Sequence, residues 1–235
     1  MRACLKRAAV GLAAVAAVIG LTTGRAAADN TYHPSDADFA DCPARPANAT
    51  GAWTCFSMTA LGGYVRLDKM SANISAPWRL TIAQGTVNGA PVAVLGGLTA
   101  GAVPFVTGIP GTDFVIPDPT GWQLQPIAVG PVKPGLMMPD SVGLKLKIIG
   151  SGLGDACLLG SDAAPVVINP QVSWFLPWLF DSTPMINTLV YDEVYSLPAA
   201  SGCANDFLVD QLLGVPANAT SNYVQIHWAF RQKAL

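Results

Sequence analysis

Apolar runs along most of the chain are short, and glycine, proline and asparagine interrupt them roughly every eight to twelve residues. This spacing predicts a mostly β domain, either an antiparallel β-sandwich or a barrel-like structure. Residues 142–149 and 223–231 alternate between apolar and polar side chains. Because successive side chains of a strand point to opposite faces, each segment is predicted to be a strand with one buried face.

Two pairs of turn-forming residues predict hairpins. Gly62 and Gly63 separate apolar residues 53–61 from residues 64–67, and glycine accepts the positive φ of a tight turn. Asn88 and Gly89 lie between residues 78–83 and 91–95 and form a pair that type I′ turns prefer. Residues 96–139 are rich in proline and are predicted to form short edge strands and long connections, without a domain boundary.

One helix is predicted over residues 205–213, near the C-terminus. Phe207, Leu208 and Leu212 recur there at helical spacing, Asn205 can cap the first turn, and Gly214 ends the run.

The first 28 residues resemble a secretory signal peptide, with a basic start, an apolar run and small residues before Asp29. A permanent membrane-spanning helix is disfavoured, because the apolar run of about 14 residues is shorter than the ~20 that a bilayer requires. We therefore expect a signal peptide over residues 1–28, a polar leader over 29–40 and one β-rich domain over 41–235. The protein is predicted to be secreted or associated with the cell wall.

Removal of this segment leaves four of the five cysteines, Cys42, Cys55, Cys157 and Cys203. An even number of cysteines in an exported chain favours disulfides. The cysteines lack the close spacing of a zinc site or a redox motif. We expect Cys42 to pair with Cys55 and Cys157 with Cys203, because cysteines that are neighbours in sequence close the smaller loops.

Charge excludes one class of partner. Four of the thirteen basic residues lie in the signal segment, so nine basic residues face fifteen acidic ones, a net charge of about −6. A nucleic-acid partner would require a clustered basic face. We expect no nucleic-acid partner.

Catalytic and metal-binding residues are not recognised in the sequence. The G-x-S-x-G motif is absent, and His33 and His227 lie in ordinary surroundings. Asp192 and Glu193 are adjacent in an apparent strand, so they point to opposite faces. Asp36, Asp38 and Asp41 could gather around calcium, but a solvated acidic leader is the preferred interpretation. We expect no catalytic residues, metal site or cofactor.

The most unusual segment is the sequence SWFLPWLFD at residues 173–181. It either fills the core at one end of the domain, which is the more common outcome, or forms an exposed apolar tip. An exposed tip would contact a protein, an apolar ligand or the cell envelope. The candidate contact residues are Trp174, Phe175, Leu176, Trp178, Leu179 and Phe180.

The order of several short motifs resembles a group of small secreted actinobacterial proteins of unknown function with four cysteines. These motifs are FADCP at residues 39–43, LTIAQG at 80–85, CLLGS at 157–161, PVVIN at 165–169 and SGC at 201–203. The resemblance implies an exported, disulfide-containing β domain and carries no activity. The chain departs from that group at residues 173–181, where a more polar connection is usual.

Three functional hypotheses follow. The first is a secreted, non-catalytic domain with a structural or interaction role outside the cell or at the cell envelope. The second is a carrier of an apolar ligand or lipid. The third is a hydrolase with dispersed catalytic residues. A filled core would favour the first, a continuous apolar cavity the second, and a cleft that joins His227 to an aspartate and a hydroxyl the third.

Overall fold

The structure is a computed structural model that describes residues 32–75, 77–108, 115–116, 121–136, 138–180 and 183–235. The predicted signal peptide lies outside these residues. The described chain forms an antiparallel sheet of fourteen strands, one α-helix near the C-terminus and two disulfides, which confirms the predicted fold class. The strands are β1 (Ala49–Leu67), β2 (Met70–Ile74), β3 (Trp78–Val87), β4 (Ala90–Ala100), β5 (Val103–Gly108), β6 (Val115–Ile116), β7 (Gln123–Lys133), β8 (Ser141–Ile149), β9 (Leu158–Leu159), β10 (Val166–Ile168), β11 (Gln171–Phe180), β12 (Thr183–Asp192), β13 (Ala200–Ser201) and β14 (Asn222–Ala234). The helices are η1 (Asp36–Phe39), α1 (Asp206–Leu213) and η2 (Ala219–Ser221).

Strand β1 is the central strand of the sheet. It has 19 residues and pairs with β14 through residues 54–67. Its other edge pairs with β3 through residues 49–59 and with β2 through residues 63–67. The predicted hairpin at Gly62 and Gly63 is wrong: Gly62 lies within β1, at a register shift relative to β14. A bulge explains why the glycine pair interrupts the apolar pattern without turning the chain.

The second predicted hairpin is confirmed. Strands β3 and β4 are joined by Asn88 and Gly89, whose φ angles are 52° and 81°. Positive φ at both central residues is the requirement of a type I′ turn.

The prediction of short edge strands between residues 96 and 139 is wrong for β7. This strand has eleven residues and pairs with β5 on one side and β8 on the other, despite Pro126 and Pro131. A register shift between Val129 and Lys133 accommodates the second proline.

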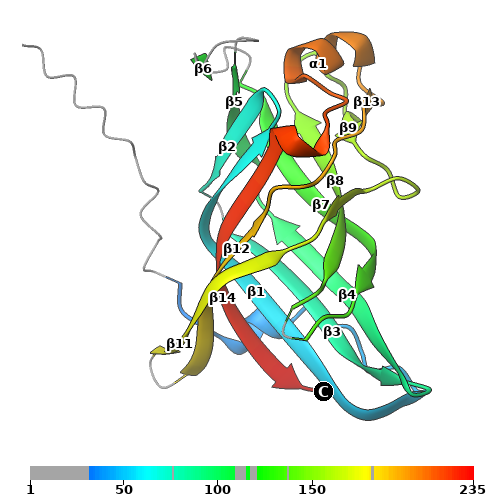
Figure 1. Cartoon of the computed structure of the whole chain (residues 1–235), viewed down its shortest axis with the longest axis vertical. Helices are drawn as coiled ribbons and strands as arrows, with labels where there is room; N and C mark the ends of the chain where they lie inside the picture. Colours follow the sequence, from blue (N-terminus) through cyan, green and yellow to red (C-terminus); the bar gives the residue numbers. More distant parts are fainter. Residues whose placement is uncertain (1–31, 76, 109–114, 117–120, 137, 181–182) are drawn as a thin grey trace, which may run out of the picture.

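The sheet is curled, and one continuous run of chain contacts two parts of it that are far apart in the strand order (Figure 1). Strand β10 pairs with β8, and after Asn169 and Pro170 the chain continues as β11, which pairs with β12. Asp192, at the end of β12, is buried and accepts hydrogen bonds from the backbone N–H groups of Asn169 (2.6 Å) and Val194 (2.8 Å). Figure 1 shows β11 crossing the front of the molecule between these two regions.

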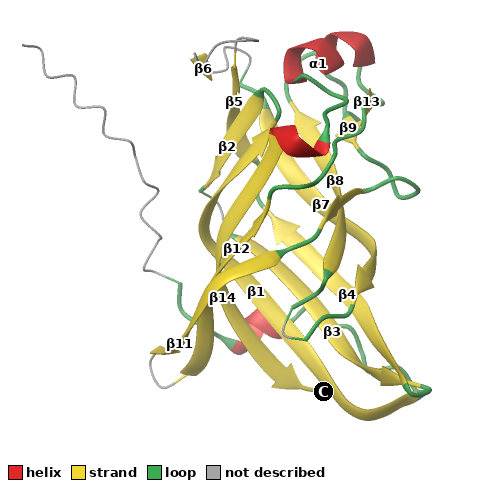
Figure 2. Cartoon of the chain, in the orientation of Figure 1, coloured by secondary structure: helices red, strands yellow, loops and turns green. Residues whose placement is uncertain are grey.

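Helix α1 forms as predicted, at one end of the sheet near β9 and β13 (Figure 2). The Asn205 side chain accepts a hydrogen bond from the backbone N–H of Leu208 (3.0 Å), and Gly214 ends the helix in the left-handed conformation. Val209 and Leu213 face the core. The disulfide between Cys157 and Cys203, which confirms the second predicted pairing, holds the start of the helix against the sheet.

Residues 32–43 form a strap across the outer face of the sheet. Arg231 of β14 donates to the Ser35 carbonyl oxygen (2.6 Å) and pairs with Asp38 (2.9 Å). The interpretation of this segment as a solvated acidic leader is therefore wrong for Asp38, which is buried together with Phe39, whereas Asp36 and Asp41 are exposed. Burial, reinforced by a hydrogen bond to Asp38, raises the pKa of Tyr32 to about 12.

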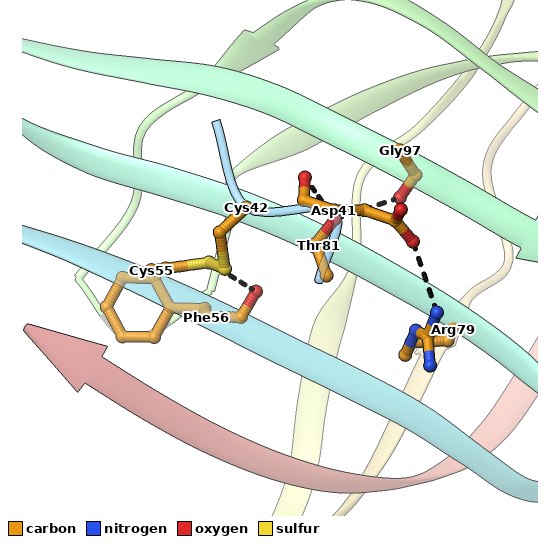
Figure 3. Close-up of a disulfide and its surroundings, with 7 residues drawn as sticks. All are labelled: Asp41, Cys42, Cys55, Phe56, Arg79, Thr81 and Gly97. Carbon is orange, nitrogen blue, oxygen red and sulfur yellow. Dashed lines mark hydrogen bonds and ion pairs between the residues drawn. A yellow bond between two sulfur atoms is a disulfide. The ribbon is translucent and has the colours of Figure 1, made fainter. Parts of the chain in front are cut away.

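The strap continues across β1, β3 and β4 (Figure 3). Cys42 is bonded to Cys55 of β1, which confirms the first predicted disulfide. Thr81 of β3 donates to the Asp41 carbonyl oxygen (3.2 Å). The strap passes so close to β4 that a Cβ atom on Gly96 would lie 2.1 Å from the same oxygen. Glycine is therefore required at this crossing.

Candidate functional site

An apolar cavity lies inside the curled sheet. Its volume is about 110 Å³, many times the ~10–15 Å³ that one water molecule requires. Its walls come from strands on all sides of the molecule and are almost entirely hydrocarbon. The lining residues include Met58, Leu80, Leu124, Leu146, Val166, Val190, Ile226 and Trp228, all of which are buried.

Two large polar side chains in the cavity wall have their hydrogen bonds made within the protein. The Tyr195 hydroxyl donates to the Arg66 carbonyl oxygen (3.2 Å), and burial raises the pKa of this hydroxyl. The Trp78 indole N–H donates to the Gly101 carbonyl oxygen (2.9 Å). These groups do not need a ligand as a partner, so the cavity is suited to a hydrocarbon surface.

Two grooves lie beside the cavity, along the end of β11 and the start of β12. The first groove, of about 30 Å³, is lined by Met138, Val172, Phe175, Ile186, Thr188 and Phe230. The second groove, of about 680 Å³, is lined by Pro177, Pro184, Met185, Ile186, Phe230, Arg231 and Gln232. Met138 belongs to the walls of both the cavity and the first groove, and Ile186 and Phe230 belong to the walls of both grooves.

The unusual segment at residues 173–181 forms part of this site. Trp174, Phe175 and Leu176 are 41%, 58% and 50% exposed, so the expectation of a core plug is not met by these residues. Phe175 and Pro177 line the grooves. The side chains of Trp178, Leu179 and Phe180 lie outside the described part of the structure.

A bulge in β11 decides which of these side chains reach the groove. The register against β12 shifts between Val172 and Trp174, so Val172 and Phe175 lie on the same face of the strand although three positions separate them. Trp174 consequently lies on the opposite face, where its ring is 5.4 Å from the ring of His227. Strict alternation from Val172 would have placed Trp174 in the groove instead.

His227 does not form the catalytic arrangement that the third hypothesis required. Burial lowers the pKa of its imidazole, and its Nε2 atom is buried without a hydrogen-bond partner among the described residues. Its ring contacts Trp174 on the outer face of the sheet, away from the cavity. Asp192 is used at the bend between β10 and β11, and Glu193 is exposed.

The acidic residues of the strap do not gather as a metal site. Asp38 pairs with Arg231, whereas Asp41 pairs with Arg79 of β3 (3.1 Å). Within the described ranges, no group of three or more histidine, cysteine, aspartate or glutamate side chains could hold a metal ion. None of the helices in this part of the chain is both long enough and apolar enough to cross a membrane.

The cavity and the grooves were not predicted as a site from the sequence. The walls of the cavity combine side chains from β1, β3, β4, β7, β8, β10, β12 and β14, and each of these residues alone is an ordinary core residue. The only signal was the apolar segment at residues 173–181, which lines the grooves at Phe175 and Pro177. No protein-family model, curated protein or solved structure matches the chain.

Proposed function

We propose that this protein is a secreted, non-catalytic carrier that binds the hydrocarbon part of an apolar ligand in its interior cavity. The observation that carries the proposal is the cavity itself, about 110 Å³ with almost entirely apolar walls. A domain with a purely structural role has no need of such a space, because protein interiors are normally close-packed. Each methylene group that leaves water for such a wall contributes roughly 0.8 kcal/mol to binding.

Two disulfides and the signal-like first 28 residues support a location outside the cell. The resemblance to secreted actinobacterial four-cysteine proteins is consistent with this location. The arrangement around His227 gives no support to hydrolysis.

An interaction role at the cell envelope is the second candidate function. The exposed apolar side chains of Trp174 and Leu176 favour it, because they lie on the outer face of β11 and do not line the grooves. This role is compatible with a carrier, which must meet a donor or acceptor of its ligand.

The carrier function can be tested with N-phenyl-1-naphthylamine, an uncharged apolar dye whose fluorescence increases when it leaves water. Adjacent residues of β10 provide a matched pair of variants, because Val166 is buried in the cavity wall and Val167 is 44% exposed. Val166→Phe should fill part of the cavity and weaken dye binding about tenfold, a loss of about 1.4 kcal/mol. Val167→Phe should bind as the unmodified protein does.

Circular dichroism and the absence of free thiols would show that both variants are folded with intact disulfides. Val190→Phe fills the cavity from β12 and replaces Val166→Phe if that variant does not fold. Absence of dye binding to the unmodified protein, or equal binding by the Val166→Phe and Val167→Phe variants, would contradict the proposal.

A further inference from the structure

The cavity and the two grooves follow one another in the same order along three strands. On β12, Val190 lines the cavity, Thr188 the first groove and Pro184 the second groove. On β14, Trp228 lines the cavity, Phe230 the first groove and Gln232 the second groove, in the same order. The chain that contains β11 also lines the cavity, the first groove and the second groove in this order. The bulge after Val172 keeps its groove-lining residues on the face that points to these spaces. The three spaces therefore lie in a row along these strands, and we refer to this row as the path.

The length and width of this path fit an extended chain. The six residue steps from Val190 to Pro184 span about 20 Å at the ordinary rise of a strand. The first groove, of about 30 Å³, is the smallest of the three spaces, compared with about 110 Å³ for the cavity and about 680 Å³ for the second groove. A single hydrocarbon chain can fit this smallest space, whereas two chains side by side cannot.

Polarity changes along the path. The cavity and the first groove are lined almost entirely by apolar atoms, whereas Arg231 and Gln232 contribute to the wall of the second groove. The guanidinium group of Arg231 is already bonded to Asp38 and to the Ser35 carbonyl oxygen. The outer end of the path can thus accept a polar group in contact with water, without an unpaired arginine to select a negative charge.

We propose that the ligand is a single-chain amphiphile whose hydrocarbon tail extends from the interior cavity along β12 and β14 and whose polar head lies in the second groove. This inference rests on the proposed carrier function and specifies the ligand class. Met138 lines both the cavity and the first groove, and its flexible side chain can change rotamer to let the tail pass. Phe175 covers the tail in the first groove.

The first test measures affinity against chain length. Straight-chain fatty acids from hexanoic to octadecanoic acid, below their critical micelle concentrations, would displace N-phenyl-1-naphthylamine from the unmodified protein. Each added methylene should tighten binding about fourfold until the path is full. Affinity that stops increasing at a short chain, which the cavity alone can hold, would contradict the extended path.

The second test uses neighbouring residues of β11 that are similarly exposed. Phe175 lines the first groove and is 58% exposed, whereas Leu176 is 50% exposed and lies on the opposite face. Phe175→Asp should reduce the affinity for hexadecanoic acid at least about tenfold. It should leave hexanoic acid and the dye unaffected, because they occupy the cavity. Leu176→Asp should change none of these affinities, and equal effects of the two substitutions would overturn the proposal.

The third test concerns the head group. Hexadecanoic acid and hexadecanol should bind with affinities that agree within about threefold, because the head lies in solvent at the mouth. A larger preference for either compound would contradict this placement. If the protein is not a carrier, the dye itself will not bind. If only the inference about the ligand class is wrong, the dye will still bind to the unmodified protein and will still bind more weakly to the Val166→Phe variant.

Discussion

The ion pair between Asp38 and Arg231 is expected to hold the strap on the sheet. The two side chains are 8% and 12% exposed, and one carboxylate oxygen of Asp38 accepts from Arg231 (2.9 Å), Tyr32 (2.7 Å) and the backbone N–H of Ser35 (3.0 Å). The guanidinium also lies over the ring of Phe39, 5.1 Å from its centroid. Removal of one charge leaves the other buried without a partner, which typically costs ~3–5 kcal/mol.

The substitution Asp38→Asn should therefore lower the free energy of unfolding by about 3 kcal/mol, the lower end of that range, because the amide keeps an oxygen acceptor. Urea unfolding of the oxidised protein, followed by tryptophan fluorescence, measures this quantity, provided that the m-value does not change. Asp38→Asn, Arg231→Gln and the double variant form a cycle whose coupling energy should be about 2 kcal/mol.

The pair between Lys145 and Asp162 is the control. Its N–O distance is 2.7 Å, but the Asp162 side chain is 81% exposed, so Asp162→Asn should cost less than about 1 kcal/mol. If Asp38→Asn lowers the free energy of unfolding no more than Asp162→Asn does, burial does not make the pair between Asp38 and Arg231 more stabilising than an exposed pair.

Three further predictions concern stability. Replacement of Cys157 and Cys203 by alanine should lower the free energy of unfolding by about 4 kcal/mol, as expected for a sequence separation of 46, whereas an unchanged urea midpoint would contradict it. Gly96→Ala should cost about 2 kcal/mol because its Cβ meets the strap. Gly97→Ala, whose Cβ would have no neighbour closer than 3.7 Å, should stay within about 0.5 kcal/mol, so equal urea midpoints for these two variants would refute the close approach. Burial lowers the pKa of His227 from 6.5, so the unfolded chain takes up this proton before the folded protein does, and the free energy of unfolding should fall as the pH drops below that value. Urea unfolding of His227→Gln should show a smaller fall in the free energy of unfolding over the same pH range. An identical pH profile for the two proteins would contradict this assignment.

Local features of the sequence were sufficient to predict the elements that depend on local chemistry. Asn88 and Gly89 turn the chain because of their own backbone preferences, and Asn205 caps α1 within a single turn. Both disulfides followed from the order of the cysteines. These features need no knowledge of distant parts of the chain.

Features that depend on distant partners were not predictable in the same way. Glycine is typical of turns, but Gly62 pairs with β14, which lies some 160 residues away in the sequence, and this pairing keeps Gly62 within a strand. The leader was interpreted as solvated because Arg231, the partner that buries Asp38, is equally remote. The cavity is an extreme case, because its existence depends on the curvature of the whole sheet.

Strand β14 lies between β1 and β12, although it is the last strand in the chain. The central strand can therefore acquire this neighbour only after residues 222–234 have been synthesised, and until then β1 and β12 each present an unsatisfied backbone edge. Such edges are sites of aggregation, and pairing across so large a sequence separation is slow. We expect the nascent chain to depend on protection from self-association more than its final stability would suggest, and C-terminal truncation to abolish production of soluble protein.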